Sequence, residues 1–393
     1  MNRSNDPPHE NAVSTRKRIP AAVQRGGIRH TLSSQSTRPR SVADKIDTLE
    51  SQEDELSSDP MLAVFDNTIR QRLVQPPTGM GAGTVLDAEI LDNSRKPWSR
   101  NKRFRVYLPA NYDPNKPASM IMLLHGCQQT EEDIASISAM DLIADREHCI
   151  VVYPYVTSYL GIRTLNCWGW WQARHRRRGS GEVADLHRIA TYVAQSYNID
   201  PGRWHICGLS SGAAMTVASL VAYSDIWTSG ASVAGIAYGE NARAVRLAKN
   251  VPIKHKAMRE LVSHMSRNLA SSPAPPLLIV QSIEDRTVGP KCASDLRDAW
   301  IKSQDIIPSR ETRAHDDKPY ADQWPSTHQW DMSLYRRSDG GCALATFWLH
   351  QGTHGWYGGR QGAYSVTDAP NTAELIWWFF DQTADSESHN NPT

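Results

Sequence analysis

The sequence predicts an α/β domain with a doubly wound, mostly parallel sheet. From about Thr84 onward, short apolar runs alternate with helical patterns. In the longest such pattern, at residues 182–200, Val183, Leu186 and Ile189 recur at helical spacing. The chain has 393 residues, of which 40% are hydrophobic, so it can bury a sizeable core.

Seven apolar runs are the strand candidates. In chain order they are residues 104–109 (FRVYLP), 119–126 (SMIMLLHG), 149–155 (CIVVYPY), 204–210 (WHICGLS), 230–236 (GASVAGI), 276–282 (PLLIVQS) and 343–350 (ALATFWLH). We expect them to form one catalytic domain at residues 99–385. A lead-in segment at 61–98 packs on this domain, and a disordered tail at 386–393 follows it.

Residues 1–60 differ in composition from the rest of the chain. They contain no Phe, Trp or Tyr and are rich in Ser, Arg, Pro and Gln. Such a segment buries too little apolar surface to offset its ordering entropy, so we expect a disordered N-terminal extension. A solvated tail is favoured over an anion-binding arm or a targeting extension.

Charge and hydropathy exclude several classes of protein. The 43 basic and 42 acidic residues create no global field that would hold nucleic acid. No run reaches the roughly 18 apolar residues of a membrane span, and the N-terminus lacks the apolar region of a secretory signal. These features favour a cytoplasmic location.

Residues 208–212, GLSSG, join a predicted strand to a predicted helix at 211–223. They match G-x-S-x-G, the turn that projects a nucleophilic serine above a sheet, with glycines where side chains would clash. Ser210 fits the nucleophile position. A serine needs a base and an orienting acid. His354 in a glycine-flanked loop is the candidate base, and Asp285 after a strand is the candidate acid.

Two nearby residues compete for these roles, Glu284 beside Asp285 and His350 on the preceding strand. The order Ser, Asp, His is that of α/β-hydrolases. The amides of Cys127 and Ser211 are the candidate oxyanion donors, one after the first parallel strand and one after the nucleophile. We expect His125 to orient the oxyanion loop rather than to act in catalysis.

The motifs LLHGCQQ, NCWGWW, RRRGSGEV, DPGRWHICGLSSGAAM, EDRTV and GTHGWYGG resemble the polyhydroxybutyrate depolymerase family of esterases over roughly residues 100–385. The resemblance implies a serine esterase without a cofactor that cleaves short-chain hydroxyacid or acyl esters. It carries the family pattern onto Cys127, Cys167 with Trp168 and Trp170, Ser210, Asp285 and His354. Secreted relatives suggest an extracellular location, which conflicts with the missing secretory signal.

Aromatic and basic side chains suggest how the substrate binds. Trp168, Trp170, Trp171 and Trp356 are candidates for the wall of an ester pocket, although core packing is the more common role of tryptophan. The run RHRRR at 174–178 is either a solvated basic turn or an attractor for a carboxylate.

The six cysteines contain no CxxC pair, so we expect no metal site. A disulfide between Cys127 and Cys167 is an open hypothesis. We therefore predict a serine esterase that acts on a small-molecule or polymeric ester. The alternatives are a feruloyl or acetylxylan type of carbohydrate esterase and a catalytically silent binding protein of the same fold. The sequence does not indicate an oligomeric state.

Overall fold

The computed structural model describes residues 59–65, 69–91, 101–156, 165–245, 252–271, 273–304, 310–315 and 329–388. All of them belong to one unit, Leu49–Thr393. Most of the predicted N-terminal extension lies outside the described residues. Asp59 and Pro60 are an exception, because Asp59 caps a short helix that begins at Pro60 and pairs with Arg336.

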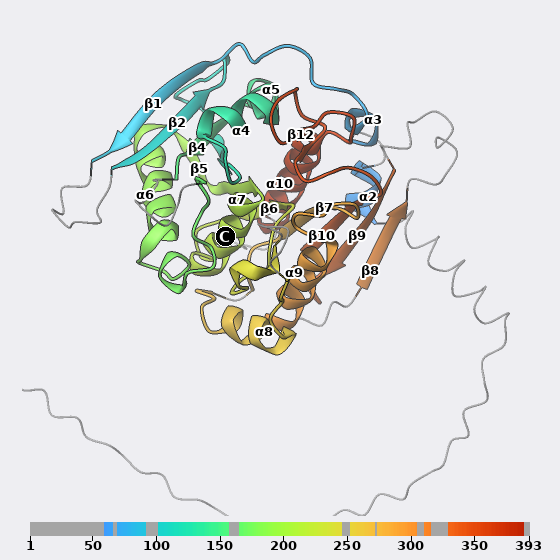
Figure 1. The fold of residues 1–393 in the computed structure, drawn as a ribbon. Coiled ribbons are helices and arrows are strands. Elements are labelled where there is room, and N and C mark those ends of the chain that lie inside the picture. Colours follow the sequence, from blue (N-terminus) through green and yellow to red (C-terminus); the bar gives the residue numbers. More distant parts are fainter. Residues whose placement is uncertain are drawn as a thin grey trace, which may run out of the picture. The chain divides into compact units, whose positions relative to one another are not determined.

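Ten strands of the described chain form one sheet (Figure 1). Its order is β1-β2-β4-β3-β5-β6-β7-β10-β9-β8. Pairing is parallel from β4 through β10 and antiparallel toward both edges. The strands are β1 (Thr84–Ile90), β2 (Lys102–Leu108), β3 (Ala118–Leu124), β4 (Cys149–Pro154), β5 (Ile199–Leu209), β6 (Ser229–Val233), β7 (Leu277–Ser282), β8 (Arg310–His315), β9 (Trp330–Arg336) and β10 (Cys342–Leu349). A separate parallel pair consists of β11 (Trp356–Tyr357) and β12 (Ser365–Val366).

Helices cover both faces of this sheet (Figure 1). One face carries α6 (Gly181–Ser196), α7 (Ser211–Ala222), α8 (Met258–Ser266) and α9 (Pro290–Ser303). The other carries α2 (Pro60–Val64), α3 (Arg70–Leu73), α4 (Glu131–Ser138), α5 (Met140–Glu147) and α10 (Thr372–Ser388). Two short 3-10 turns, Ala173–His175 and Ala242–Ala244, lie in connections.

Strand periodicity divides the buried residues between these two faces. On β3, Met120 and Met122 pack under the helices of the first face, whereas Ile121 and Leu123 pack under those of the second. Because successive side chains of a strand point to opposite faces, a sheet covered on both sides needs strands that are apolar throughout. Every residue of β3 is indeed buried.

The predicted fold class is confirmed, and all seven predicted strands are present. The prediction missed β1, β8 and β9, which lie at the edges of the sheet and pair in antiparallel fashion. On β9, Trp330, Met332 and Leu334 alternate with less buried residues. This alternation was the sequence feature from which β9 could have been predicted. The final helix extends to Ser388, so the predicted tail begins too early.

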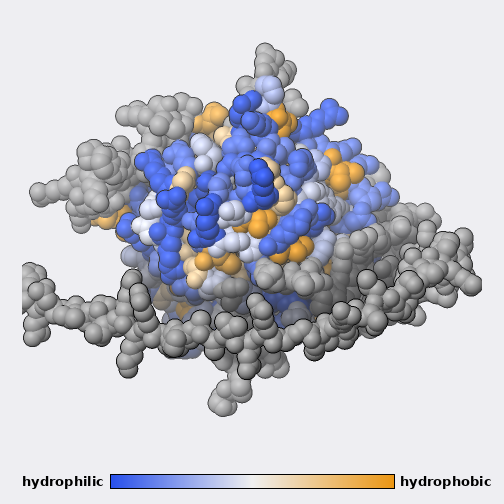
Figure 2. Space-filling model, turned by 90° about the horizontal axis from the view of Figure 1, so that it is seen from below, coloured by the Kyte–Doolittle hydropathy of each residue, from blue (hydrophilic) through white to orange (hydrophobic). Residues whose placement is uncertain are grey.

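The surface is mixed in character. Figure 2 shows a largely hydrophilic face on which hydrophobic residues appear in small, separate areas. Isolated exposed apolar side chains of this kind are normal on a folded domain. Among the helices that the structure describes, none combines the length and the apolar character required to span a bilayer.

Candidate active site

Ser210 lies between the end of β5 and the start of α7, as the sequence predicts. Its backbone has φ 57° and ψ −115°, a conformation that is unfavourable for a residue with a side chain. A Cβ atom on Gly208 would lie 2.6 Å from the backbone of Gly212, and one on Gly212 would lie 2.4 Å from the carbonyl oxygen of Leu124. Only glycine fits at these two positions, so the surrounding backbone holds Ser210 in its strained turn.

The structure brings the three predicted reactive side chains together. The Ser210 hydroxyl oxygen lies 2.9 Å from Nε2 of His354. On the other side of the ring, Nδ1 of His354 lies 2.7 Å from Oδ2 of Asp285. Because a carboxylate only accepts hydrogen bonds, Nδ1 carries the proton and Nε2 is free to accept the hydroxyl proton. Three segments that are far apart in sequence meet here.

Asp285 is nearly fully buried and its carboxylate is held by several donors. Oδ1 accepts the backbone N–H groups of Thr287 at 2.8 Å and Val288 at 2.9 Å. Nε2 of Gln281 approaches Oδ2 at 3.4 Å. These contacts leave one orientation of the carboxylate, in which Oδ2 faces the imidazole ring of His354.

The two competing residues make other hydrogen bonds, although Glu284 lines the same cavity as Ser210. Glu284 is exposed, and its carboxylate accepts the amide of Gly352 at 3.4 Å. His350 lies 2.8 Å from a carboxylate oxygen of Asp331. Neither residue contacts Ser210. The structure therefore separates the predicted acid and base from their neighbours in sequence.

The residues of the two candidate oxyanion donors, Cys127 and Ser211, line the same cavity as Ser210. Ser211 is the first residue of α7, and the first amides of a helix have no partner within it. Cys127 follows the turn after β3 and lines the same cavity as Ser210. Oε1 of Gln129 accepts the Gly126 amide at 2.8 Å and so fixes this turn. Gln129 is a positioning residue that the sequence analysis missed, although it lies in the quoted LLHGCQQ motif.

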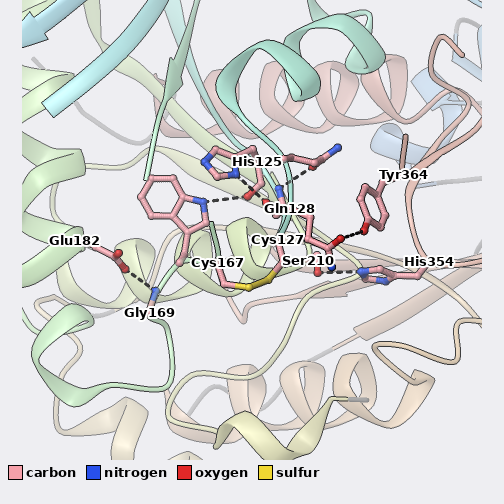
Figure 3. Close-up of a disulfide and its surroundings, with 12 residues drawn as sticks. His125, Cys127, Gln128, Cys167, Gly169, Glu182, Ser210, His354 and Tyr364 are labelled. Carbon is pink, nitrogen blue, oxygen red and sulfur yellow. Dashed lines mark hydrogen bonds between the residues drawn. A yellow bond between two sulfur atoms is a disulfide. The ribbon is translucent and has the colours of Figure 1, made fainter. Parts of the chain in front are cut away.

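His125 is buried beneath the oxyanion turn and does not contact Ser210 (Figure 3). Its Nδ1 donates to the Gly126 carbonyl at 2.8 Å, and its Nε2 accepts the Val156 amide at 3.2 Å. Burial lowers the pKa of His125 to about 4, so the ring is neutral near pH 7. The indole N–H of Trp168 donates to the His125 carbonyl at 3.0 Å. These contacts fit the loop-orienting role expected for His125.

A disulfide joins Cys127 to Cys167, as the open hypothesis anticipated (Figure 3). It ties the oxyanion turn to the segment that begins at Leu165. A backbone hydrogen bond of 2.6 Å from Gln128 to Leu165 reinforces this link. On the other side, the Tyr364 hydroxyl donates to Oε1 of Gln128 at 3.0 Å. The turn is therefore fixed from both sides.

Ser210 and His354 open into a cavity of about 710 Å³. Of the four predicted substrate-binding tryptophans, Trp170 and Trp171 line it. Trp168 and Trp356 are not among the lining residues, which corrects the prediction for these two. Trp168 is buried and its indole N–H donates to the His125 carbonyl. Trp356 is fully buried in the core of the second face. The prediction also missed aliphatic and polar lining residues, which include Leu165, Ile236, Val245, Arg286, Val288 and Tyr364.

In the part of the chain that the structure describes, one cluster has ligand atoms close enough to share a metal ion. It consists of Glu240, His255 and Asp295, whose atoms lie within 4.8 Å of one another. Lys291 already donates to Asp295 at 2.8 Å, and the Lys256 amide donates to Glu240 at 3.1 Å. None of these residues is part of the group around Ser210.

The strand order, the strained turn at Ser210 and its hydrogen-bonded histidine and aspartate define an α/β-hydrolase. A sequence model of the esterase PHB depolymerase family matches residues 103–318, more than half of the chain. The protein therefore belongs to this family.

Curated relatives include esterases with different substrates. Poly(3-hydroxyalkanoate) depolymerase C of Paucimonas lemoignei is 30% identical over 138 residues, which cover 35% of this chain and 32% of that protein. Feruloyl esterase B of Neurospora crassa is 27% identical over 213 residues, 51% of this chain and 69% of its own length. This chain thus spans about a third of the depolymerase and about two thirds of the feruloyl esterase.

A solved structure, an acetyl xylan esterase from Aspergillus awamori, has a TM-score of 0.54 and 15% identity. The similarity covers 76% of this chain and all of that one. At this level of identity it supports the fold alone.

Proposed function

We propose that the protein is a serine esterase that cleaves carboxylic esters through an acyl-enzyme. The observation that carries this proposal is the continuous hydrogen-bonded series from Ser210 through His354 to Asp285, with distances of 2.9 and 2.7 Å. Membership of an esterase family supports the same conclusion. In this proposal Ser210 is the nucleophile, His354 the general base and acid, and Asp285 the residue that orients the imidazole.

In the acylation step, the Ser210 oxygen attacks the ester carbonyl carbon while its proton moves to Nε2 of His354. Asp285 stabilises the imidazolium that forms and remains ionised. The negative charge develops on the former carbonyl oxygen, where the amides of Cys127 and Ser211 can donate to it. The intermediate then collapses, and His354 returns the proton to the alcohol that leaves.

In the deacylation step, water replaces the alcohol and the same residues act again. His354 removes a proton from the water, which attacks the acyl carbon. The second tetrahedral intermediate expels the Ser210 oxygen, which takes the proton back from His354. The products are a carboxylic acid and the restored serine, so the cycle consumes one water and needs no cofactor.

The cavity supports a small or oligomeric acyl substrate. A volume of about 710 Å³ lies within the range of pockets that bury a small organic ligand. Oligomers or polymers of 3-hydroxybutyrate are the first candidate, since the family and one relative carry depolymerase names. A feruloyl or acetylxylan ester is the second candidate, because relatives with these names also match and Trp170 and Trp171 offer aromatic walls.

The test compares wild type with Ser210→Ala on p-nitrophenyl butyrate, a 3-hydroxybutyrate trimer, methyl ferulate and p-nitrophenyl acetate. The variant should lose about 10⁶-fold in kcat, because it removes the nucleophile. Ser211→Ala is a useful control, since the Ser211 hydroxyl has no hydrogen-bond partner among the described residues and the backbone amide remains. Equal rates for wild type and Ser210→Ala would refute the mechanism. No turnover and no phosphonate labelling by wild type would favour a catalytically silent binding protein.

A further inference from the structure

A second cavity of about 370 Å³ shares no lining residue with the first and has a different character. Its lining includes three arginines, Arg176, Arg177 and Arg267, together with Tyr238, His264 and Asn268. Two of the arginines come from the RHRRR run, and the third follows α8. The walls offer many hydrogen-bond donors, and no carboxylate is among the lining residues.

The arginines of this cavity lack acidic partners within the described residues. Arg178, the next residue along the chain, shows the contrast, because its Nη2 donates to Asp225 at 2.9 Å on the surface. Arg176 instead donates from Nη1 to the carbonyls of Trp170 and Trp171, at 3.2 and 3.0 Å. Arg267 donates to the Ser263 carbonyl at 2.9 Å. Neutral carbonyl groups thus orient the guanidinium groups of Arg176 and Arg267 without neutralising their charge.

The electrostatic potential in this cavity is positive, and partial burial disfavours positive charges that lack an anionic partner. Partial burial and the neighbouring Arg177 lower the pKa of Arg176, with Tyr238 opposing them. Burial and then Lys256 lower the pKa of His264, and Arg176 and Arg267 act in the same direction. An anion that enters would relieve this repulsion and accept charge-assisted hydrogen bonds.

Residues that line the two cavities lie close to one another. Trp170 and Trp171 line the first cavity, and their carbonyls accept hydrogen bonds from Arg176 of the second. Ile236 lines the first cavity and Tyr238, two residues further along the chain, lines the second. Two residues of chain span at most about 7 Å. This short separation is the geometric basis for a ligand that extends from the ester site to the basic cavity.

We propose that the second cavity binds the free carboxylate of an ester substrate whose scissile bond lies at Ser210. The planar guanidinium groups of Arg177 and Arg267 match a carboxylate, and Arg176 adds a third positive charge to the lining. This inference rests on the proposed esterase function and adds to it a preference for acidic esters. A free phosphate ion also offers negatively charged oxygen acceptors to the arginines, so the experiment distinguishes a substrate carboxylate from a free phosphate.

The experiment measures kcat/KM for a linear 3-hydroxybutyrate trimer and for its methyl ester, which differ only in the terminal charge. Wild type should prefer the free acid by about tenfold, mainly through KM, as one or two charge-assisted hydrogen bonds would give. The double variant R177Q/R267Q should bring this ratio close to one. High salt should reduce the wild-type preference, because the cavity is open to solvent.

The matched control is R188Q/R259Q, which removes the same charge from two exposed arginines outside both cavities. It should retain the wild-type ratio. A ratio that R177Q/R267Q leaves unchanged would overturn the inference, and so would a wild type without any preference for the acid. Inorganic phosphate that binds wild type but not R177Q/R267Q in calorimetry, without a preference for the acid, would assign the cavity to a free anion instead.

These outcomes remain distinct from a failure of the proposed function. If the esterase proposal is wrong, wild type cleaves neither the trimer, nor its methyl ester, nor p-nitrophenyl butyrate. If only the carboxylate inference is wrong, wild type cleaves all three, and its ratio of acid to methyl ester equals that of R177Q/R267Q.

Discussion

Replacing Asp285 with asparagine tests the proposed role of the buried carboxylate most directly. The two backbone amides of Thr287 and Val288, at 2.8 and 2.9 Å, require an oxygen at the position of Oδ1. The new amide nitrogen must then occupy the position of Oδ2, 2.7 Å from Nδ1 of His354. There it donates a hydrogen bond to Nδ1, so the imidazole proton moves to Nε2. In this tautomer His354 cannot accept the proton of Ser210.

The expected loss of kcat depends on which of two orientations the new amide side chain adopts. Turning the amide over would restore the correct tautomer but would leave two buried N–H groups facing an NH₂ group, at a cost of about 1–3 kcal/mol each. The longer contact from Gln281, at 3.4 Å, is too weak to reverse this choice. We expect Asp285→Asn to lower kcat by about 10⁴-fold, or about 5.4 kcal/mol of transition-state stabilisation.

The assay is the initial rate on p-nitrophenyl butyrate, with far-ultraviolet circular dichroism and a thermal melt to establish folding. Asp331→Asn is the matched control, because this aspartate also contacts a histidine, His350, at 2.8 Å but is not among the residues that line the cavity. It should stay within a few-fold of wild type. A folded Asp285→Asn variant that retains more than a tenth of the wild-type kcat would refute the reasoning.

Three further predictions concern the supports of the site. Gln129→Leu removes the acceptor that fixes the oxyanion turn, and kcat should fall about 10–100-fold with little change in KM. Replacing Cys127 and Cys167 with serine opens a link of sequence separation 40, and urea denaturation should show a loss of about 4 kcal/mol. The free energy of unfolding should decrease as the pH falls from 6.5 toward 4, because burial lowers the pKa values of His125 to about 4 and His205 to about 3.

The sign of the pH effect follows from linkage. Both histidines are neutral in the folded protein and have pKa values near 6.5 in the unfolded chain, so the unfolded state binds more protons in this interval. Each group contributes a slope of at most about 1.4 kcal/mol per pH unit. Urea titrations at pH 7.5, 6 and 5 measure how the free energy of unfolding depends on pH. Equal free energies of unfolding at these three pH values would contradict the prediction.

Controls for the other two predictions use the same assays. Gln128→Leu changes a neighbouring glutamine that contacts Tyr364 at the rim of the cavity, so it should alter KM more than kcat. An equal loss of kcat in both glutamine variants would argue against a specific role for Gln129. Dithiothreitol should destabilise wild type but not the Cys127→Ser/Cys167→Ser variant; sensitivity of both proteins to the reductant would contradict the disulfide prediction.

The sequence by itself determined the central part of the fold and the turn at Ser210. Strands such as β3 and β4 can be recognised from local sequence, because a strand buried on both faces must be apolar along its length. The requirement for Gly208 of GLSSG is also local, since its Cβ atom would meet the backbone of Gly212 in the same turn, whereas a Cβ atom on Gly212 would meet Leu124 on the neighbouring strand β3. Edge strands were harder to recognise, because no residue of β1 is buried and β9 shows only a short alternation of buried and less buried residues.

Only the tertiary structure decided which side chains meet. Sequence order proposed Ser210, Asp285 and His354, but Glu284 and His350 were equally close along the chain, and the distances in space separate them. The four tryptophans looked alike in sequence, yet Trp168 and Trp356 pack inside while Trp170 and Trp171 line the cavity. The basic run divided in the same way, with Arg178 paired on the surface and Arg176 and Arg177 lining a cavity. Such choices depend on contacts between segments far apart in the chain, which local patterns do not encode.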